Sequence, residues 1–194
     1  QYSLNETQIH RQTITLVIEN PDGAKAGGRV IVDLKQRILE VVDDTYHVEF
    51  QQSLIDREGS LGEQVSEQLT QGTAQCWIDN RGALREHMAT TMNPVPSFPE
   101  EALDPGELWT VMQPAPGGGF MQVNFCFEKV EDDVAHLVSH CIPQPGSDGG
   151  QSEIRTSLQF ALKPGGALES TTVMTTLYPD GRKVNQVIHS KRVN

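Results

Sequence analysis

The chain is poor in cysteine and has no long hydrophobic run. Its 194 residues include three cysteines, Cys76, Cys126 and Cys141. That number is too small for a disulfide framework, and no CxxC pair is present for a metal or redox motif. A single Cys126–Cys141 bridge is possible if their strands pair, and buried free thiols are the alternative. No apolar run approaches the roughly 20 residues that a membrane-spanning helix needs, so we expect no transmembrane helix.

Basic residues are also scarce. Fifteen Lys and Arg face 26 Asp and Glu, which gives a formal net charge of −11. Binding to nucleic acid or to anionic lipid depends on clusters of Lys and Arg. In this chain only the C-terminal "HSKRVN" is locally basic, so the composition predicts neither kind of partner.

Recognisable catalytic motifs are missing as well. The sequence has no GxSxG elbow, HExxH pair, Walker loop or GxGxxG fingerprint. The glycine-rich "PGGGF" (116–120) lacks the lysine and the following helix of a phosphate-binding loop. The carboxylate pairs at 43–44 and 132–133 lie where hairpin turns are predicted, and solvated Asp is common there. We therefore predict a protein that is not an enzyme and needs no cofactor.

One group of potential metal ligands stands out, in "HLVSHC" (136–141). On a helix, His136 and His140 would share a face at metal-binding spacing. On a strand they would lie roughly 13 Å apart, too far for one zinc ion. The flanking valines and leucine, which follow an acidic turn, favour a strand and predict no metal site.

Alternating apolar and polar residues are the dominant pattern in the chain. Ile14, Leu16 and Ile18 share one face of a first predicted strand, and hairpins follow with turns at "DD" (43–44), "DNRG" (79–82), "EDD" (131–133) and "YPDG" (178–181). A loop is predicted over 20–28 and a helical turn around 61–70. The segment 29–42 favours a strand, although a helix remains possible in its second half. The pattern predicts nine or ten strands in a mainly β, single domain (1–194), with antiparallel sheet forming a half-barrel or a sandwich and at most one or two short helices.

A proline-rich segment interrupts this pattern at 93–106. Its prolines remove backbone donors and favour extended conformations, so we predict a connection that crosses the fold. It leads into Trp109, which we expect to pack into the core near a strand start. Its carboxylates are those of solvated surface residues or, as a second interpretation, part of a partner or ligand site. The candidate residues for that site are Phe98, Trp109, Glu100, Glu101, Asp104 and Glu107.

The phrase "FPEEALDPGELW" (98–109) resembles one found in an uncharacterised family of bacterial envelope proteins and lipoproteins. The order of the flanking elements also agrees: "DNRGAL" precedes the phrase, and "VNFCFEKVEDDVAHL" and "PGGAL" follow it. The usual "GDSW" reads "GELW" here. The resemblance implies a β-rich exported protein and names no activity.

These features together predict a non-catalytic exported domain that binds an apolar ligand or a protein partner. The alternative is an accessory subunit of a larger envelope or membrane-associated assembly. The resemblance and the start at Gln1, without Met, predict an extracytoplasmic location in the periplasm or cell envelope, with a lipid anchor before Gln1 left open.

Overall fold

The computed structural model describes residues 3–63, 73–80, 97–114, 120–142, 149–162 and 166–193. Almost all of them lie in β-strands or in the turns between strands. The strands are β1 (Thr7–Glu19), β2 (Lys25–Val42), β3 (Thr45–Glu58), β4 (Thr73–Asp79), β5 (Leu108–Pro114), β6 (Phe120–Glu131), β7 (Val134–Cys141), β8 (Gln151–Ala161), β9 (Gly166–Leu177) and β10 (Lys183–Arg192).

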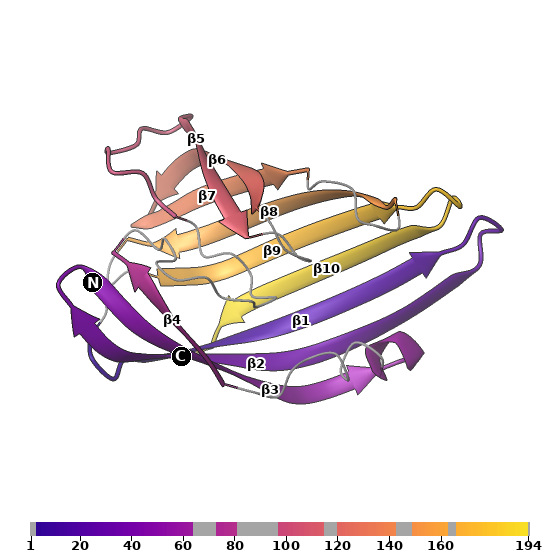
Figure 1. The fold of residues 1–194 in the computed structure, drawn as a ribbon, viewed down its shortest axis with the longest axis horizontal. Helices are drawn as coiled ribbons and strands as arrows, with labels where there is room; N and C mark the ends of the chain where they lie inside the picture. The colour runs from indigo at the N-terminus through magenta and orange to yellow at the C-terminus, as the bar shows by residue number, and fades with distance from the viewer. Residues whose placement is uncertain are drawn as a thin grey trace.

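All ten strands belong to one antiparallel sheet in the order β4-β3-β2-β1-β10-β9-β8-β7-β6-β5 (Figure 1). Two meanders make up this order, β1 to β4 and β5 to β10. They join in the middle of the sheet, where β1 pairs with β10 from Glu19↔Lys183 to His10↔Arg192. The first and last strands of the chain therefore lie at the centre.

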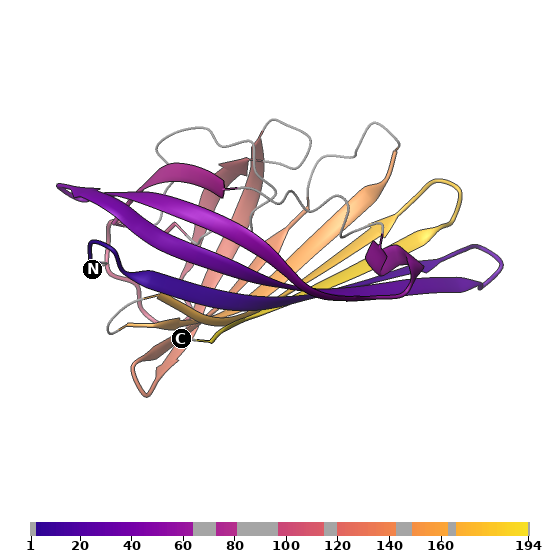
Figure 2. The ribbon, with the colours of Figure 1, turned by 90° about the horizontal axis from the view of Figure 1, so that it is seen from below.

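The sheet is twisted and curved, and it does not close into a barrel. In Figure 2, β3 and β4 at one end and β5 and β6 at the other turn toward the same side. We call that side the concave face and the opposite side the convex face. The expected antiparallel, mainly β architecture is confirmed, and the structure selects one open curved sheet over a two-sheet sandwich.

Side chains alternate between the two faces as strand geometry requires. In β1, every second residue from Gln8 to Ile14 is buried, and the residues between them are half-buried or exposed. The same phase places Val30 and Val32 of β2 in the interior, each 1% exposed. The buried set faces the concave side.

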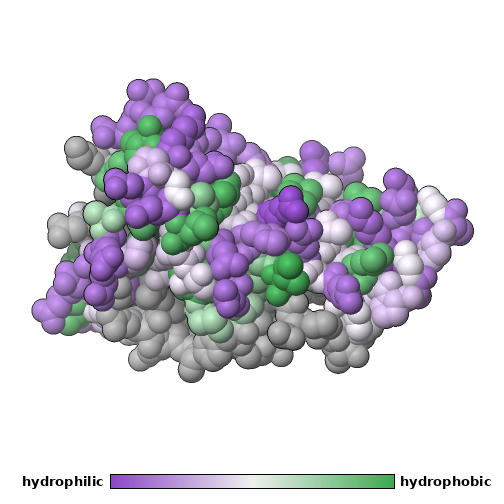
Figure 3. Space-filling model, turned by 90° about the horizontal axis from the view of Figure 1, so that it is seen from above, coloured by the Kyte–Doolittle hydropathy of each residue, from purple (hydrophilic) through white to green (hydrophobic). Residues whose placement is uncertain are grey.

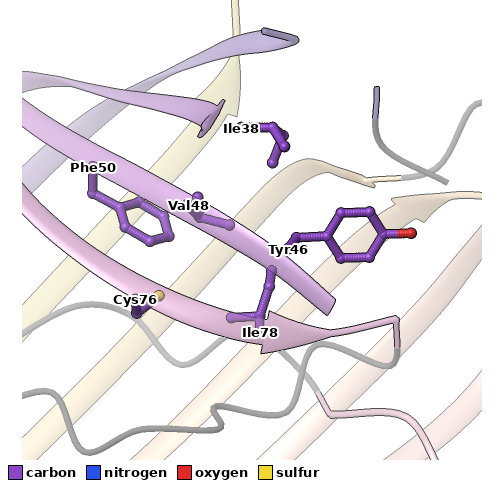
Figure 4. Close-up of a cluster of buried hydrophobic side chains, with 6 residues drawn as sticks. All are labelled: Ile38, Tyr46, Val48, Phe50, Cys76 and Ile78. Carbon is purple, nitrogen blue, oxygen red and sulfur yellow. The ribbon is translucent and has the colours of Figure 1, made fainter. Parts of the chain in front are cut away.

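The concave face carries four apolar clusters. The largest, shown in Figure 4, joins β2, β3 and β4 and consists of Ile38, Tyr46, Val48, Phe50, Cys76 and Ile78. A second lies on β1 and β2 around Ile14. The other two lie on β6 and β7, one around Phe125 and one around Leu137. The apolar clusters are therefore divided between the two meanders.

The convex face carries ion pairs between neighbouring strands. Arg11 and Asp33 form a bidentate pair, with Nε–Oδ1 at 2.9 Å and Nη2–Oδ2 at 3.0 Å. Arg37 and Glu49 pair at 2.9 Å. The arginine side chains are 50% and 44% exposed and their carboxylate partners 22% each. Water therefore screens both pairs, and each contributes little to stability.

Tight turns connect the strands where the sequence predicts them. Asp43, Asp132 and Asp133 adopt φ values of 51°, 51° and 60°, the left-handed conformation that Asp tolerates better than most residues. In "YPDG", the Gly181 amide donates to the Tyr178 carbonyl at 3.0 Å. The turns at 43–44, 132–133 and 178–181 are thus confirmed.

The loop predicted over 20–28 is too long. The turn ends at Ala24, whose carbonyl accepts a hydrogen bond from the Asn20 amide at 2.9 Å, and β2 begins at Lys25. Glycine occurs inside this strand because another backbone packs directly on it. A Cβ on Gly28 would lie 2.1 Å from the backbone nitrogen of Gly62. The glycines that looked like loop residues therefore permit a close backbone contact.

The remaining predictions for the first meander are partly covered by the structure. Residues 29–42 form strand throughout, which excludes the helix considered for their second half. A helical turn covers 60–63. The rest of the helical segment predicted around 61–70, and "DNRG" beyond Asn80, lie outside the described residues. No helix in the described ranges is long and apolar enough to span a membrane.

Candidate functional site

The proline-rich segment enters the sheet through a hydrogen-bonded turn. Gly106, at φ 95°, donates its amide to the Phe127 carbonyl of β6 at 2.6 Å, and the Phe127 amide donates to the Glu107 carbonyl at 3.0 Å. The Glu107 carboxylate accepts a bond from the Asp104 amide at 2.7 Å. The turn at 104–107 is therefore attached to β6 and fixes where β5 starts.

An aromatic cluster lies where this segment meets the concave face. The Trp109 ring stacks on Phe125, with centroids 5.1 Å apart, and lies 6.2 Å from Phe98. Phe98 also meets Phe160 edge to face at 5.1 Å. The Trp109 indole N–H donates to the Ser97 carbonyl at 2.9 Å. The expectation that Trp109 packs against the core near a strand start is confirmed.

The four acidic candidates lie in the same segment, and their part in a partner or ligand site stays a prediction. Glu100, Glu101, Asp104 and Glu107 are all exposed. Glu107 stabilises the turn, because its carboxylate accepts a hydrogen bond from the Asp104 amide. Within the described residues, no group of three or more His, Cys, Asp or Glu is arranged to hold a metal ion. Of the six candidates, Phe98 and Trp109 contact each other, and their role in binding stays a prediction.

Between the apolar clusters, the floor of the concave face is polar. The buried polar side chains on β1, β9 and β10 are Gln8, His10, Gln12, Thr176 and Ser190, each at most 9% exposed. In the strand register, Gln12 lies directly opposite Ser190, and His10 lies opposite Arg192. The two central strands thus bring these side chains together.

Some of the hydroxyl groups on this face pair across strands. Ser152 and Thr176 lie within 2.9 Å of each other, and Thr156 and Thr172 within 3.0 Å. By contrast, no hydrogen bond joins the side chain of His10 or Gln12 to another residue in the described ranges. Burial, assisted by the charge of Arg192, lowers the pKa of His10 below 6.5. His10 is therefore neutral at pH 7.

The convex face has a shallow groove of about 500 Å³ over β5 to β9. Leu108, Cys126, Val138 and Val173 are among its lining residues. Figure 3, viewed from the β5 end of the sheet, shows hydrophobic surface in separate patches between hydrophilic side chains. The groove is therefore a second surface with apolar residues, on the face opposite the aromatic cluster.

The histidines of "HLVSHC" lie on strand β7, as expected, at positions of the same phase. His140 Nε2 lies 2.9 Å from Glu153 Oε1, and Arg155 donates to the same oxygen at 2.7 and 3.0 Å. Hydrogen bonds from Arg155 and then from His140 lower the pKa of Glu153 below 4.5. His140 thus belongs to a hydrogen-bond network with Glu153 and Arg155 on the convex face.

Cys126 and Cys141 do not form the disulfide bridge that the sequence left possible. Strands β6 and β7 do pair, but Cys126 lies opposite Val138, three residues from Cys141. An odd offset puts the two side chains on opposite faces of the sheet, and all three cysteines are free thiols. Burial raises the pKa of Cys76 to about 11 and also raises that of Cys141.

The polar floor was not identified from the sequence, although its signal was present. Ile14, Leu16 and Ile18 were assigned to one face of the first strand. The same phase, continued toward the N-terminus, puts Gln12, His10 and Gln8 on that face. Polar residues on the buried phase of a strand are the signal for such a site.

Comparisons with known proteins leave the family open. No family model matches the chain, and no curated protein matches it. Among solved structures, a conserved protein of unknown function with a hot dog fold from Alicyclobacillus acidocaldarius is similar, with 11% sequence identity and a TM-score of 0.20, over 94% of this chain and 79% of that chain. At that TM-score no inference about this protein is drawn, and the likeness of residues 98–109 to envelope lipoproteins stays a prediction.

Proposed function

We propose that this protein is a non-catalytic binding domain that holds an apolar ligand on the concave face of its sheet. The observation that carries the proposal is the half-buried aromatic cluster of Phe98, Trp109 and Phe160 at one end of that face. Aromatic rings left partly exposed beside a core provide a large apolar contact surface.

The architecture supports the same proposal. The described elements form a single curved sheet, and within the described ranges no second sheet lies against its concave side. Apolar clusters occupy both meanders on that side. A ligand lying between them would exchange water for apolar contacts, which is favourable at roughly 25 cal/mol per Å² of apolar surface buried.

An extracytoplasmic location belongs to the same proposal. Its support is the resemblance of "FPEEALDPGELW" to the phrase of envelope proteins. A carrier or binding domain in the envelope would meet lipids and other apolar molecules without needing a catalytic site.

Binding of the apolar dye N-phenyl-1-naphthylamine tests the proposal. The wild-type protein should enhance the fluorescence of the dye, with energy transfer from tryptophan. The variant Phe98→Ala should bind it about tenfold more weakly, because loss of one aromatic contact costs roughly 1.4 kcal/mol. Leu108→Ala, a variant on the convex face of neighbouring β5, is the matched control and should bind like wild type. Absence of dye binding by the wild type, or equal binding by Phe98→Ala, would refute the proposal.

A second candidate function, an accessory subunit, rests on a different observation. Strand β5 is at one end of the sheet and exposes Leu108 and Met112 to 75% and 60%. An edge strand with exposed apolar residues favours pairing with a strand of another polypeptide. Native mass spectrometry of the protein, isolated gently from its source, should then show a bound polypeptide. The variant Leu108→Lys should no longer bind this polypeptide and should still bind the dye. A lone chain in the wild-type sample contradicts this role.

A further inference from the structure

The polar floor contains three buried side chains on adjoining positions of two paired strands. Gln12 of β1 lies opposite Ser190 of β10, and His10 follows two residues along β1 on the same face. Their exposed fractions are 7%, 6% and 9%. These side chains are therefore largely covered by protein at the centre of the sheet. Their polar atoms still reach solvent, because among the described residues only Arg182 Nε is fully buried without a hydrogen-bond partner.

Burial of such groups carries a cost unless they are hydrogen-bonded. The threonine and serine pairs Thr156–Thr172 and Ser152–Thr176 on the same face meet that requirement within the protein. In the described part of the chain, the side chains of His10, Gln12 and Ser190 have no such partner. An incoming hydrogen-bonding group would provide what these three side chains lack.

The charges around the three side chains favour an uncharged partner. Burial raises the pKa of Glu6, but hydrogen bonds from the Ser3 amide and from Gln8 lower it further, and the charge of Arg192, opposite His10, adds to that lowering. The charge of Arg192 is thus partly balanced by the carboxylate of Glu6. His10 is neutral at pH 7, for the reason given above. A hydroxyl or amide group, which both donates and accepts, matches neutral His, Gln and Ser.

A path of residues connects this floor to the aromatic cluster. Across the sheet, Ser190 lies opposite Ser170, and Ser170 lies opposite Leu158. Leu158 packs with the cluster that includes Phe98 and Trp109. The distance from β10 to β8 is two strand spacings, about 10 Å, which an alkyl chain bridges readily.

From these observations we infer that the ligand is an uncharged amphiphile, of the monoacylglycerol class, whose hydroxylated head binds His10, Gln12 and Ser190 while its alkyl chain runs across β9 and β8 toward Phe98. This inference rests on the proposed function. It adds the chemical class of the ligand and the position of its polar end.

Titration with monolauroylglycerol below its micellar concentration, followed by calorimetry, tests the inference. Wild type should bind it at least tenfold more tightly than it binds laurate at pH 7. Gln12→Leu removes the hydrogen-bonding group at nearly constant volume and should weaken monolauroylglycerol binding about tenfold, with dye binding retained. Thr13→Val, on the other face of the same strand, is the matched control and should bind like wild type.

The unliganded variants provide a second measurement. Because Gln12→Leu replaces a buried polar group by an apolar one, its thermal midpoint without ligand should rise above that of wild type. A lowered midpoint would mean that Gln12 is satisfied within the protein and would overturn the inference, as would unchanged monolauroylglycerol binding.

The two proposals fail in distinguishable ways. Binding of the dye without preference for monolauroylglycerol over laurate overturns the inference about the head group and leaves the apolar site standing. Binding of neither dye nor monolauroylglycerol overturns both.

Discussion

Cys126 differs from the other two cysteines in the face of the sheet that it occupies. It is half-buried on the convex face, in the wall of the groove. Cys76 and Cys141 are buried on the concave face, each 3% exposed. Reactivity of a thiol requires both access and the thiolate form, so the three residues should behave differently in the native protein.

We predict one reactive thiol per native chain at pH 8. Cys126 should react first with 5,5′-dithiobis(2-nitrobenzoic acid), because burial raises the pKa of Cys76 to about 11 and raises that of Cys141. All three should react in denaturant. Cys126→Ser is the control and should abolish the fast phase. A fast phase that persists in this variant would contradict the assignment.

His10 gives the stability of the protein a defined pH dependence. Its pKa is lowered below 6.5 by burial and then by the charge of Arg192. The unfolded chain therefore takes up a proton at a higher pH than the folded chain does. By linkage, stability falls as the pH drops below about 6.5 and levels off below the pKa of the folded state.

The prediction is that His10→Gln flattens this part of the stability profile. The difference in free energy of unfolding between wild type and variant should be constant above pH 7 and should shift in favour of the variant as the pH falls through 6.5. Urea denaturation at a series of pH values measures it. An NMR titration that places the pKa of native His10 at or above 6.5 would be incompatible with this account.

At the scale of elements, the start of β2 depends on a backbone contact with the helical turn at 60–63. Gly28 permits the approach of Leu61 and Gly62, whose backbone atoms would lie 2.1 to 2.9 Å from a Cβ at this position. Backbone atoms cannot rotate away as a side-chain end can. The long first hairpin and the segment after β3 are thereby held together.

Gly28→Ala should therefore destabilise the protein by about 3 kcal/mol, through overpacking of backbone against backbone. Gly27→Ala is the matched control, because its Cβ would meet the Leu16 carbonyl oxygen at an ordinary 3.4 Å. Chemical denaturation of both variants measures the difference. Equal stability of the two would show that the segment after β3 moves away at no cost.

At the scale of the whole molecule, the pairing of β1 with β10 joins the two meanders. It is the step in the sheet order that connects strands from opposite ends of the chain. Pairing over such a sequence separation forms late and requires that both meanders be present. The centre of the sheet should thus be more sensitive to disruption than its ends.

Proline substitutions test this expectation. Val187→Pro in β10 removes a backbone donor between Thr15 of β1 and Val173 of β9 and should prevent folding. Thr110→Pro in the terminal strand β5, which pairs with β6 alone among the described strands, should lower stability by a smaller amount. Circular dichroism and urea denaturation measure both. A folded Val187→Pro variant as stable as Thr110→Pro would contradict the central role of the pairing.

The sequence by itself determined the strands, most of the turns and the packing of Trp109, because these depend on local alternation and on the backbone preferences of Asp, Gly and Pro. The loop predicted over 20–28 includes residues that belong to β2, because no local pattern reveals that Gly28 packs against the backbone of Gly62. The tertiary structure alone decided the order of the strands, the separation of Cys126 from Cys141, and the meeting of His10 and Gln12 with Ser190. Those features depend on strand register, which places Cys126 opposite Val138 on β7 and Gln12 opposite Ser190 at the other end of the chain. Register is set by the packing of the complete sheet.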